Sequence, residues 1–312
     1  MRNNIPKIKV IGIGGSGVNA ISRMAKEGIS QVELIAVNTD AQSLKACPVA
    51  RRILIGRQTT QGLGAGMDIK LGQKAARESQ EELKQAISGA ELVFLASGMG
   101  GGTGSSAIPI LGEIAKSLNA LTLAVVTLPF AFEGIQRKAV ANQALRTLDG
   151  KVDALLTIPN DKLLSLVKPN TSVQDAFWFC DGVLREAVKG ITDLVSMPGI
   201  INVDFADLRG ILENSGRALL GIGKARGEKR ALVAASNALK SPLLDFSFKD
   251  SDGILLNIAG SGDLSLTEVN TAASFVKKSA QSRAKIVFGV SEDASLKDGE
   301  IKVTVIATSK KR

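Results

Sequence analysis

The chain has 312 residues, of which 45% are hydrophobic, 22% charged and 4% aromatic, and its formal net charge is +9. It is long enough for about two domains, and it contains no His, no Tyr and only two cysteines, Cys47 and Cys180, without a C-x-x-C pair. These counts exclude a Ser-His-Asp triad, most zinc sites and a disulfide framework, and the scarcity of aromatic rings argues against a single-stranded nucleic-acid partner.

The first residues lack the apolar region of a signal peptide, and no apolar run is long enough to span a bilayer. We therefore expect a cytoplasmic protein that does not insert into a membrane. The Lys and Arg residues are scattered apart from one run at 310–312. We interpret the basic charge mainly as a solvated surface and expect no nucleic-acid partner.

The first two-thirds of the chain alternates short apolar runs with helical patterns. The predicted strands are 8–13, 32–37, 53–55, 92–96, 121–127 and 154–158, and the predicted helices between them are 18–26, 67–88, 106–118 and 134–148. Apolar strands separated by helices predict an α/β fold, a Rossmann-like parallel sheet covered on both faces. Ligands of such sheets bind at the carboxyl ends of the strands.

The last third of the chain differs in character. A long helical pattern over 173–197 ends at Pro198-Gly199, and a short helix is predicted around 207–214. A smaller α/β domain follows, with helices at 229–239 and 266–278 and strands at 254–259, 285–290 and 300–308. We expect the last two strands to form a terminal hairpin, with a turn at Asp298-Gly299 before the final strand.

The first glycine-rich loop is Gly12-Ile13-Gly14-Gly15-Ser16-Gly17, between a predicted strand and a predicted helix. It matches the G-x-G-x-x-G pattern, in which backbone N–H groups approach a phosphate at a helix N-terminus. Alone, the pattern favours a dinucleotide, and Asp40 follows the next strand near the distance expected of a ribose-binding acid. The alternative is a tight turn without a ligand.

The second glycine-rich loop covers 98–106 with the sequence G-M-G-G-G-T-G-S-S. So many glycines carry an entropic cost that a plain connector would not need, and Thr103 and Ser105 add hydroxyl donors. No Lys follows the glycines, so this is not a P-loop, and an NAD-binding domain has no second loop of this kind. Two such loops at neighbouring strand ends indicate a di- or triphosphate held by backbone N–H groups.

The segment 100–105, G-G-G-T-G-S, resembles the signature loop of the tubulin/FtsZ family. The resemblance continues in order through N-T-D-A-Q (38–42), G-L-G-A-G (62–66), P-F-A-F-E-G (129–134), I-P-N-D-K-L-L (158–164), N-V-D-F-A-D (202–207) and S-P-L-L-D (241–245). The last two segments favour the FtsZ branch over eukaryotic tubulin. The sequence is thus identified as a member of this family along nearly its whole length.

The resemblance implies a GTP-binding domain over 1–172, a central helix over 173–197, a catalytic loop and short helix over 198–216, and a C-terminal α/β domain over 217–312. It also implies a GTPase that polymerises head to tail with copies of itself into cytoskeletal filaments, as in the division ring at mid-cell. GTP or GDP would bind with Mg²⁺ held mainly by phosphates and water, because the sequence shows no carboxylate cage and so no protein metal ligand.

By resemblance, the nucleotide is bound by both glycine loops and by residues after other strands. These residues are Gly14, Gly15, Ser16, Gly17, Asn19, Asn38, Gly100, Gly101, Gly102, Thr103, Gly104, Glu133, Arg137, Asn160, Phe177 and Asp181. Glu133 and Arg137 are four residues apart on a helical stretch, so the alternative for them is a surface ion pair.

Phe177 and Asp181 lie one helical turn apart on one face of the long helix. The ring can stack on a purine, and the carboxylate can accept the two N–H donors that guanine presents and adenine lacks. This pair would explain a preference for GTP over ATP. The alternative is a core ring next to a solvated acid.

Asn202, Asp204 and Asp207 are the candidate catalytic residues. In proteins of this family their loop enters the nucleotide site of the next subunit, where the carboxylates position the attacking water. That scheme explains catalysis without His, and it predicts hydrolysis coupled to assembly. The alternative is that these acids only stabilise the first turn of a helix through its dipole.

Some features depart from the family pattern. The signature loop ends in Ser105-Ser106 where Gly or Ala is more usual, and the net charge is basic rather than acidic. Family members usually continue beyond the last strand to a tail that binds membrane-tethering division proteins, and this sequence stops at Arg312. Partners of that kind are therefore left open.

Two other functions compete with an assembling GTPase. One is an NAD-dependent oxidoreductase, which the second glycine loop and the lack of a His or Tyr proton donor disfavour. The other is a non-catalytic GTP-binding filament relative, which the cluster of Asn202, Asp204 and Asp207 disfavours.

Overall fold

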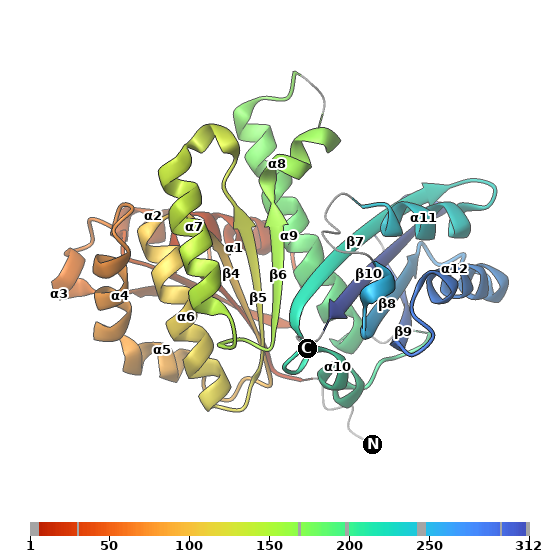
Figure 1. Ribbon diagram of the computed structural model, residues 1–312, viewed down its shortest axis with the longest axis horizontal. Helices are drawn as coiled ribbons and strands as arrows, with labels where there is room; N and C mark the ends of the chain where they lie inside the picture. Colours follow the sequence, from red (N-terminus) through yellow and green to blue (C-terminus); the bar gives the residue numbers. More distant parts are fainter. Residues whose placement is uncertain are drawn as a thin grey trace. The chain divides into compact units, whose positions relative to one another are not determined.

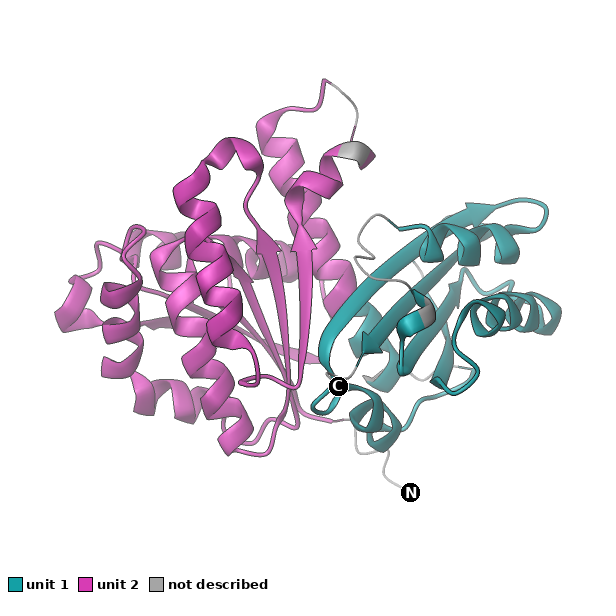
Figure 2. Ribbon diagram, viewed as in Figure 1, with its two compact units in different colours: residues 1–5, 189–312 teal, residues 6–188 magenta. Residues whose placement is uncertain are grey.

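A computed structural model describes residues 6–29, 31–167, 170–196, 200–241, 248–293 and 295–309. The chain divides into two compact units, and the boundary falls inside the long helix α9 (Val173–Ser196). Residues 6–188 belong to the first unit, and the chain from residue 189 onward belongs to the second (Figure 2). Each unit is described by itself.

The sheet of the first unit is parallel. Its strands are β1 (Ile8–Ile13), β2 (Val32–Asn38), β3 (Arg51–Leu54), β4 (Leu92–Gly98), β5 (Leu121–Leu128) and β6 (Ala154–Pro159). They are ordered β3-β2-β1-β4-β5-β6, and every described pairing among them is parallel. The predicted Rossmann-like sheet is therefore confirmed (Figure 1).

Helices connect these strands and cover the sheet. They are α1 (Gly14–Glu27), α2 (Ala41–Ala46), α3 (Arg57–Thr60), α4 (Ile69–Glu78), α5 (Gln80–Ile87), α6 (Gly102–Ser117), α7 (Ile135–Leu148) and α8 (Asn160–Leu163). The single helix predicted over 67–88 is wrong, because Ser79 ends α4 and begins α5. Its hydroxyl accepts a hydrogen bond from the Gly56 backbone N–H, 3.0 Å away, and this contact competes with continued helix.

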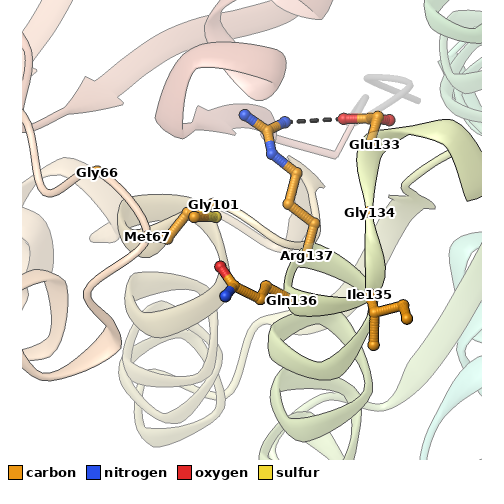
Figure 3. A pocket seen from close by; sticks show the side chains of 8 residues that line it. All are labelled: Gly66, Met67, Gly101, Glu133, Gly134, Ile135, Gln136 and Arg137. Carbon is orange, nitrogen blue, oxygen red and sulfur yellow. Dashed lines mark hydrogen bonds and ion pairs between the residues drawn. The ribbon is translucent and has the colours of Figure 1, made fainter.

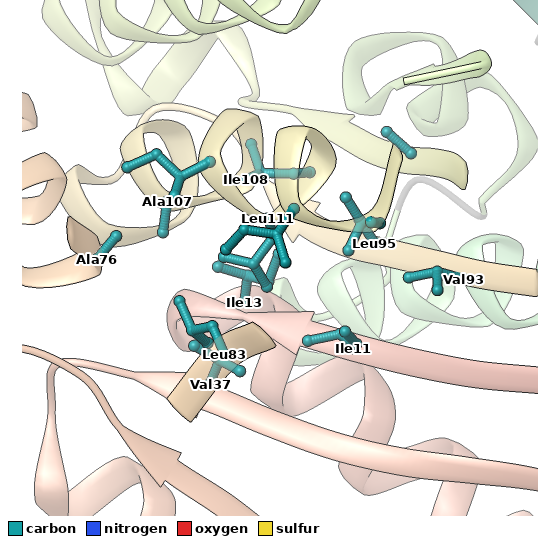
Figure 4. Close-up of a cluster of buried hydrophobic side chains, with 14 of the residues drawn as sticks. Ile11, Ile13, Val37, Ala76, Leu83, Val93, Leu95, Ala107, Ile108 and Leu111 are labelled. Atoms are coloured by element: carbon teal, nitrogen blue, oxygen red, sulfur yellow. The ribbon is translucent and has the colours of Figure 1, made fainter. Parts of the chain in front are cut away.

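A large core lies between one face of this sheet and the helices α4 to α7 (Figure 4). Alternate residues of the strands, such as Ile11, Ile13 and Leu95, point toward Ile108 and Leu111 of α6. The opposite face is covered by α1, which packs against β1, β2 and β4. Because β1 and β4 are buried on both faces of the sheet, their carboxyl ends, where the glycine loops begin, are held in place.

The second unit has a mixed sheet ordered β7-β10-β8-β9. Its elements are α10 (Phe205–Leu212), β7 (Gly216–Arg226), α11 (Arg230–Leu239), β8 (Gly253–Gly260), α12 (Leu266–Ser279), β9 (Lys285–Glu292) and β10 (Glu300–Ser309). Helices α11 and α12 bury their apolar sides against the sheet. The predicted turn before the last strand is present at Asp298-Gly299.

Two expectations for this unit are wrong. The terminal hairpin does not form, because β8 lies between β9 and β10 and pairs with both of them. Strand β7, which pairs antiparallel with β10, was not predicted. Its glycines hide the strand pattern, and Gly223 is required by packing, since a Cβ there would lie 2.1 Å from the Ala234 backbone oxygen on α11.

No helix in the described part of the chain combines the length and the apolar character needed to cross a bilayer.

Candidate functional site

A polar cavity of about 270 Å³ lies in the first unit, at the carboxyl ends of β1, β4, β5 and β6. Apart from Gly66, which lies between α3 and α4, its lining residues follow those strands or lie on α9. The full lining is Gly14, Gly15, Ser16, Gly66, Gly98, Met99, Gly101, Gly102, Thr103, Gly104, Thr127, Pro129, Glu133, Arg137, Asn160, Phe177, Cys180 and Asp181. The cavity thus brings together most of the predicted nucleotide-binding residues.

Both glycine loops end in a helix start at the cavity. Helix α1 begins at Gly14 after Ile13, and α6 begins at Gly102 after Gly101, and neither N-cap residue makes a side-chain capping bond in the structure. The first backbone N–H groups of a helix have no acceptor within the helix, and the helix dipole places partial positive charge there. Two uncapped helix starts at one cavity make a site for an anion.

The glycines of these loops divide into two kinds. Gly14 has φ +70°, and a Cβ there would lie 2.9 Å from the backbone nitrogen of Gly104, so the fold itself requires glycine. At Gly15 and Gly101 a Cβ would meet nothing within 4 Å, and neither residue has positive φ. Both of these glycines line the cavity. A ligand that approaches the backbone would account for them.

Glu133 and Arg137 form one wall of the cavity. Arg137 Nη1 lies 2.8 Å from Glu133 Oε2, so the ion pair considered from the sequence is present. Glu133 is held in place, because its Oε1 accepts a hydrogen bond from the Phe130 backbone N–H at 2.9 Å. Figure 3 shows this pair beside an adjoining hollow of about 740 Å³, which Gly66 and Gly101 also line.

The α9 side of the cavity presents a ring and an acid. Phe177 packs edge-on against Phe130, with ring centroids 5.2 Å apart. Asp181 is mostly buried and pairs with Arg23 of α1, with Nη1 and Oδ2 2.7 Å apart. Burial raises the pKa of Asp181 to about 6, and the charge of Arg23 opposes that rise. The neighbouring Cys180 is not a nucleophile, because burial and the Asp181 charge raise the pKa of its thiol to about 12.

Asn160 follows β6 at the cavity wall. Its side chain is buried, and its Oδ1 atom has no hydrogen-bond partner among the described residues. A buried acceptor without a donor costs about 1–3 kcal/mol. Because Asn160 also lines the cavity, a ligand with a hydroxyl or N–H donor would remove that cost.

Some predicted residues lie near the cavity without lining it. Asn19 is exposed on α1, and Gly17 is buried in the first turn of the same helix. Asn38 is buried and accepts the Thr39 N–H at 2.9 Å. Gly100 has φ +104° and donates its N–H to the Ser105 hydroxyl, 2.9 Å away. These residues shape the loops around the cavity.

Sequence reasoning did not single out several lining residues: Gly66, Thr127, Pro129 and Cys180, as well as Gly98 and Met99, which it included only as part of the second glycine-rich loop. It also missed Arg23, the partner of Asp181. Thr127 and Pro129 could have been found from the rule that ligands bind at the carboxyl ends of parallel strands. The Gly66 segment was noted only for its resemblance, and no sequence signal identifies Arg23.

Asn202, Asp204 and Asp207 lie in the second unit and are exposed. Asp204 occupies the N-cap position of α10, but its side chain makes no capping hydrogen bond in the structure. Asp207 pairs with Lys285 of β9, with Oδ1 and Nζ 3.1 Å apart. A backbone bridge between Ile201 and Val290 fixes the preceding loop to β9. Both carboxylates are therefore presented at the surface.

The described residues contain no group of three or more Cys, Asp or Glu side chains able to hold a metal ion.

The tubulin/FtsZ GTPase-domain model matches residues 7–168 of this chain, and the FtsZ C-terminal-domain model matches residues 216–311. The chain belongs to the tubulin/FtsZ family. Its fold is that of the family, with a GTPase domain followed by a C-terminal domain. Membership decides against the dinucleotide interpretation of the first glycine loop.

Solved structures of the family support this assignment. A structure of FtsZ from M. jannaschii, described as an empty dimer, is 42% identical with TM-score 0.94, covering 99% of this chain and 89% of that one. A point mutant of the same FtsZ is 43% identical with TM-score 0.94, covering 98% and 91%. CetZ2 from Haloferax volcanii, a GTPγS-bound protofilament, has the same fold at 24% identity and TM-score 0.83, covering 98% and 94%.

Proposed function

We propose that this GTPase binds GTP in the polar cavity, hydrolyses it when a second copy of the chain completes the site, and so assembles head to tail into filaments. The observation that carries the proposal is that one cavity has an end suited to phosphates and an end suited to a guanine base. Uncapped starts of α1 and α6 suit phosphates at one end, and Phe177 with Asp181 suits a guanine at the other.

The phosphates would be held mainly by backbone. The N–H groups at the starts of α1 and α6 donate to phosphate oxygens, and Gly15 and Gly101 leave room for close approach. Thr103 keeps its hydroxyl 2.6 Å from that of Thr39, and this contact fixes the second loop on the fold. Arg137 is half-exposed beside Glu133 and adds a positive charge at the cavity edge.

The base and ribose would be recognised by side chains. The Asp181 carboxylate accepts the two N–H donors on one edge of guanine, and Phe177 offers a ring face to stack on. The free Oδ1 acceptor of Asn160 suits a ribose hydroxyl or a base N–H. These contacts would favour guanine over adenine, which lacks the paired donors.

Mg²⁺ fits this site as a metal held by the nucleotide. The carboxylates that line the cavity, Glu133 and Asp181, are both in ion pairs, so they are not poised as metal ligands. Mg²⁺ keeps several waters and binds phosphate oxygens well. The Ser16 and Thr127 hydroxyls at the wall can hydrogen-bond to such waters. When bound, the ion would offset negative charge on the phosphates.

The cavity lacks a group of its own to position the attacking water. Its two carboxylates are engaged, its thiol is protonated, and the chain has no His. Exposed acids on the second unit, Asp204 and Asp207, can supply that group to a neighbouring copy, because the pair of Asp207 with Lys285 is exposed to water and therefore weak. The contact would join two different surfaces, so it would propagate into an open filament. The dimer and protofilament among the related structures support this arrangement.

The same proposal extends to the cell. Filaments of this kind would form a division ring at mid-cell in the cytoplasm, and membrane-tethering division proteins would bind them. This part rests on family membership alone.

The contrast between two acids tests the proposal. Asp207→Ala should leave GTP affinity of the monomer nearly unchanged and lower turnover by about 100-fold or more, since it removes the group that positions water. Asp181→Ala should weaken GTP binding itself by about 10-fold or more. Equilibrium binding and phosphate release measure the two effects.

If Asp207→Ala lost GTP binding as a monomer, the acid would be structural and the proposed role would be wrong. If Asp181→Ala bound GTP normally, the guanine end of the site would be misassigned. A chain that binds GTP and assembles without turnover would be a non-catalytic relative.

A further inference from the structure

Arg23 approaches the cavity from α1 and contacts two of its α9 residues. Its Nη1 lies 2.7 Å from Asp181 Oδ2 and donates a longer hydrogen bond, 3.4 Å, to the Phe177 backbone oxygen. The Arg23 and Asp181 side chains are only 24% and 13% exposed. The contact is therefore a partly desolvated ion pair at the cavity wall, which water weakens less than an exposed pair.

The other charged groups around Asp181 are already engaged. Glu133, which also lines the cavity, pairs with its own arginine, Arg137. One turn along α9, Arg185 pairs with Glu27 of α1. Cys180 is protonated. Arg23 is thus the cation that balances Asp181 in the described part of the chain.

The charge state of Asp181 decides what it can bind. An ionised carboxylate only accepts hydrogen bonds, whereas a protonated one turns one oxygen into a donor and no longer presents two anionic acceptor oxygens to a pair of N–H groups. Burial favours the protonated form and raises the pKa of Asp181 to about 6 even with Arg23 beside it. Only one carboxylate oxygen contacts Arg23, so acceptor sites remain for a base.

We propose that Arg23 is a specificity-determining positioning residue: by pairing with Asp181 it keeps that carboxylate ionised and oriented to accept both N–H donors of guanine at neutral pH. The inference rests on the proposed binding of guanine at Asp181. Arg23 need not touch the nucleotide. Its effect is on the ratio of guanine to adenine nucleotide affinity and on the pH at which that ratio collapses.

The test compares GDP and ADP binding across pH. The ADP dissociation constant divided by the GDP dissociation constant measures the preference for guanine. The ionisation of the phosphates, which both ligands share, cancels in this ratio. In the wild type the ratio should fall as the pH drops through about 6, where Asp181 becomes protonated. Arg23→Met removes the charge at similar length, and the fall should then occur about 1 to 3 pH units higher.

At pH 7, a midpoint raised by 1 to 3 units from about 6 lowers the ionised fraction of Asp181, so Arg23→Met should lose roughly 2-fold to 90-fold in discrimination, and above the displaced midpoint it should recover most of the loss. Arg23→Lys keeps the positive charge and should retain part of the discrimination between GDP and ADP at neutral pH. Lys26→Met removes the same charge from an exposed position on the same helix and should leave the curve unchanged.

An Arg23→Met curve that coincides with the wild type would overturn the proposal. So would a loss of equal size at every pH, because that is the result of a purely structural role. Failure of the proposed function would look different: the wild type would not prefer GDP, or Asp181→Ala would keep the preference.

Discussion

Gly15 and Gly101 separate what the fold requires from what a ligand requires. Neither position has positive φ, and a Cβ at either would meet nothing within 4 Å. Gly15→Ala and Gly101→Ala should therefore keep the thermal stability of the protein. Each should weaken GTP binding by about 10-fold or more, because the added methyl group would occupy space that a phosphate needs.

Two other glycines provide the comparison. Gly182 is on α9 and is not one of the lining residues, and a Cβ there would meet nothing within 4 Å, so Gly182→Ala should gain about 0.5–1 kcal/mol of stability and bind GTP normally. Gly14→Ala should destabilise the fold. If Gly15→Ala and Gly101→Ala bound GTP as tightly as the wild type, the backbone-held phosphate would be wrong.

At the scale of single residues, the sequence predicts which residues line the cavity better than it predicts which side chains contact one another. The glycine patterns, and the family resemblance that includes Phe177 and Asp181, identified residues that line the cavity. The ion pair of Asp181 with Arg23 could not be predicted, because the partners are far apart in sequence and meet only through the packing of α1 and α9. The same holds for the unpaired oxygen of Asn160, which depends on burial.

At the scale of the elements, a buried ion pair fixes the last strand of the second unit. Lys302 of β10 and Asp293, which follows β9, are 4% and 5% exposed, with Nζ and Oδ2 2.6 Å apart. Lys189 of α9 lies 3.5 Å from the same oxygen. Burial alone would raise the pKa of Asp293, but hydrogen bonds from Lys302 and Ser295 outweigh it and hold the pKa well below the usual range.

Lys302→Met should lower the free energy of unfolding by about 3–5 kcal/mol at neutral pH, since it leaves the buried carboxylate of Asp293 with only the longer contact to Lys189 as an ion pair. Because the folded-state pKa of Asp293 lies below its ordinary value, the stabilisation is present above about pH 4 and is lost as the pH falls further. The difference between wild type and variant should therefore shrink in acid. Urea unfolding at several pH values measures it.

Lys285→Met is the matched control, because it breaks the exposed pair with Asp207. It should change the unfolding free energy by less than about 1 kcal/mol. Equal effects of the two substitutions, or no loss in Lys302→Met, would contradict the structural role of the buried pair.

Element types were predicted well where apolar runs were continuous and poorly where glycines or pairing order decided. Strands β1 to β6 were found from β-branched runs. Strand β7 was missed because its three glycines break the apolar run, and the hairpin was wrongly predicted because the order in which strands pair cannot be read from their order in the chain. Ser106, which stands where the family more usually has Gly or Ala, has a packing role on α6. Its hydroxyl donates a hydrogen bond to the Gly102 backbone oxygen at 2.6 Å and fills the space beside Gly72 of α4.

At the scale of the whole molecule, the chain presents two halves of one proposed reaction on two units. Helix α9 carries Phe177 and Asp181 in the unit that holds the cavity, and its last residues belong to the unit that carries Asp204 and Asp207. The division into a nucleotide-binding part and a C-terminal part follows from motifs in the sequence. Assembly does not, because it depends on surfaces that single residues do not reveal.

The most direct test of the account is GTP hydrolysis per subunit as a function of protein concentration, in the presence of Mg²⁺ and alongside light scattering. We expect specific activity to stay low below a threshold concentration and to rise with scattering above it, while Asp207→Ala scatters light without comparable turnover. A specific activity that is independent of concentration would mean that one chain contains the complete site, and it would contradict the proposal that a neighbouring copy supplies the catalytic acid.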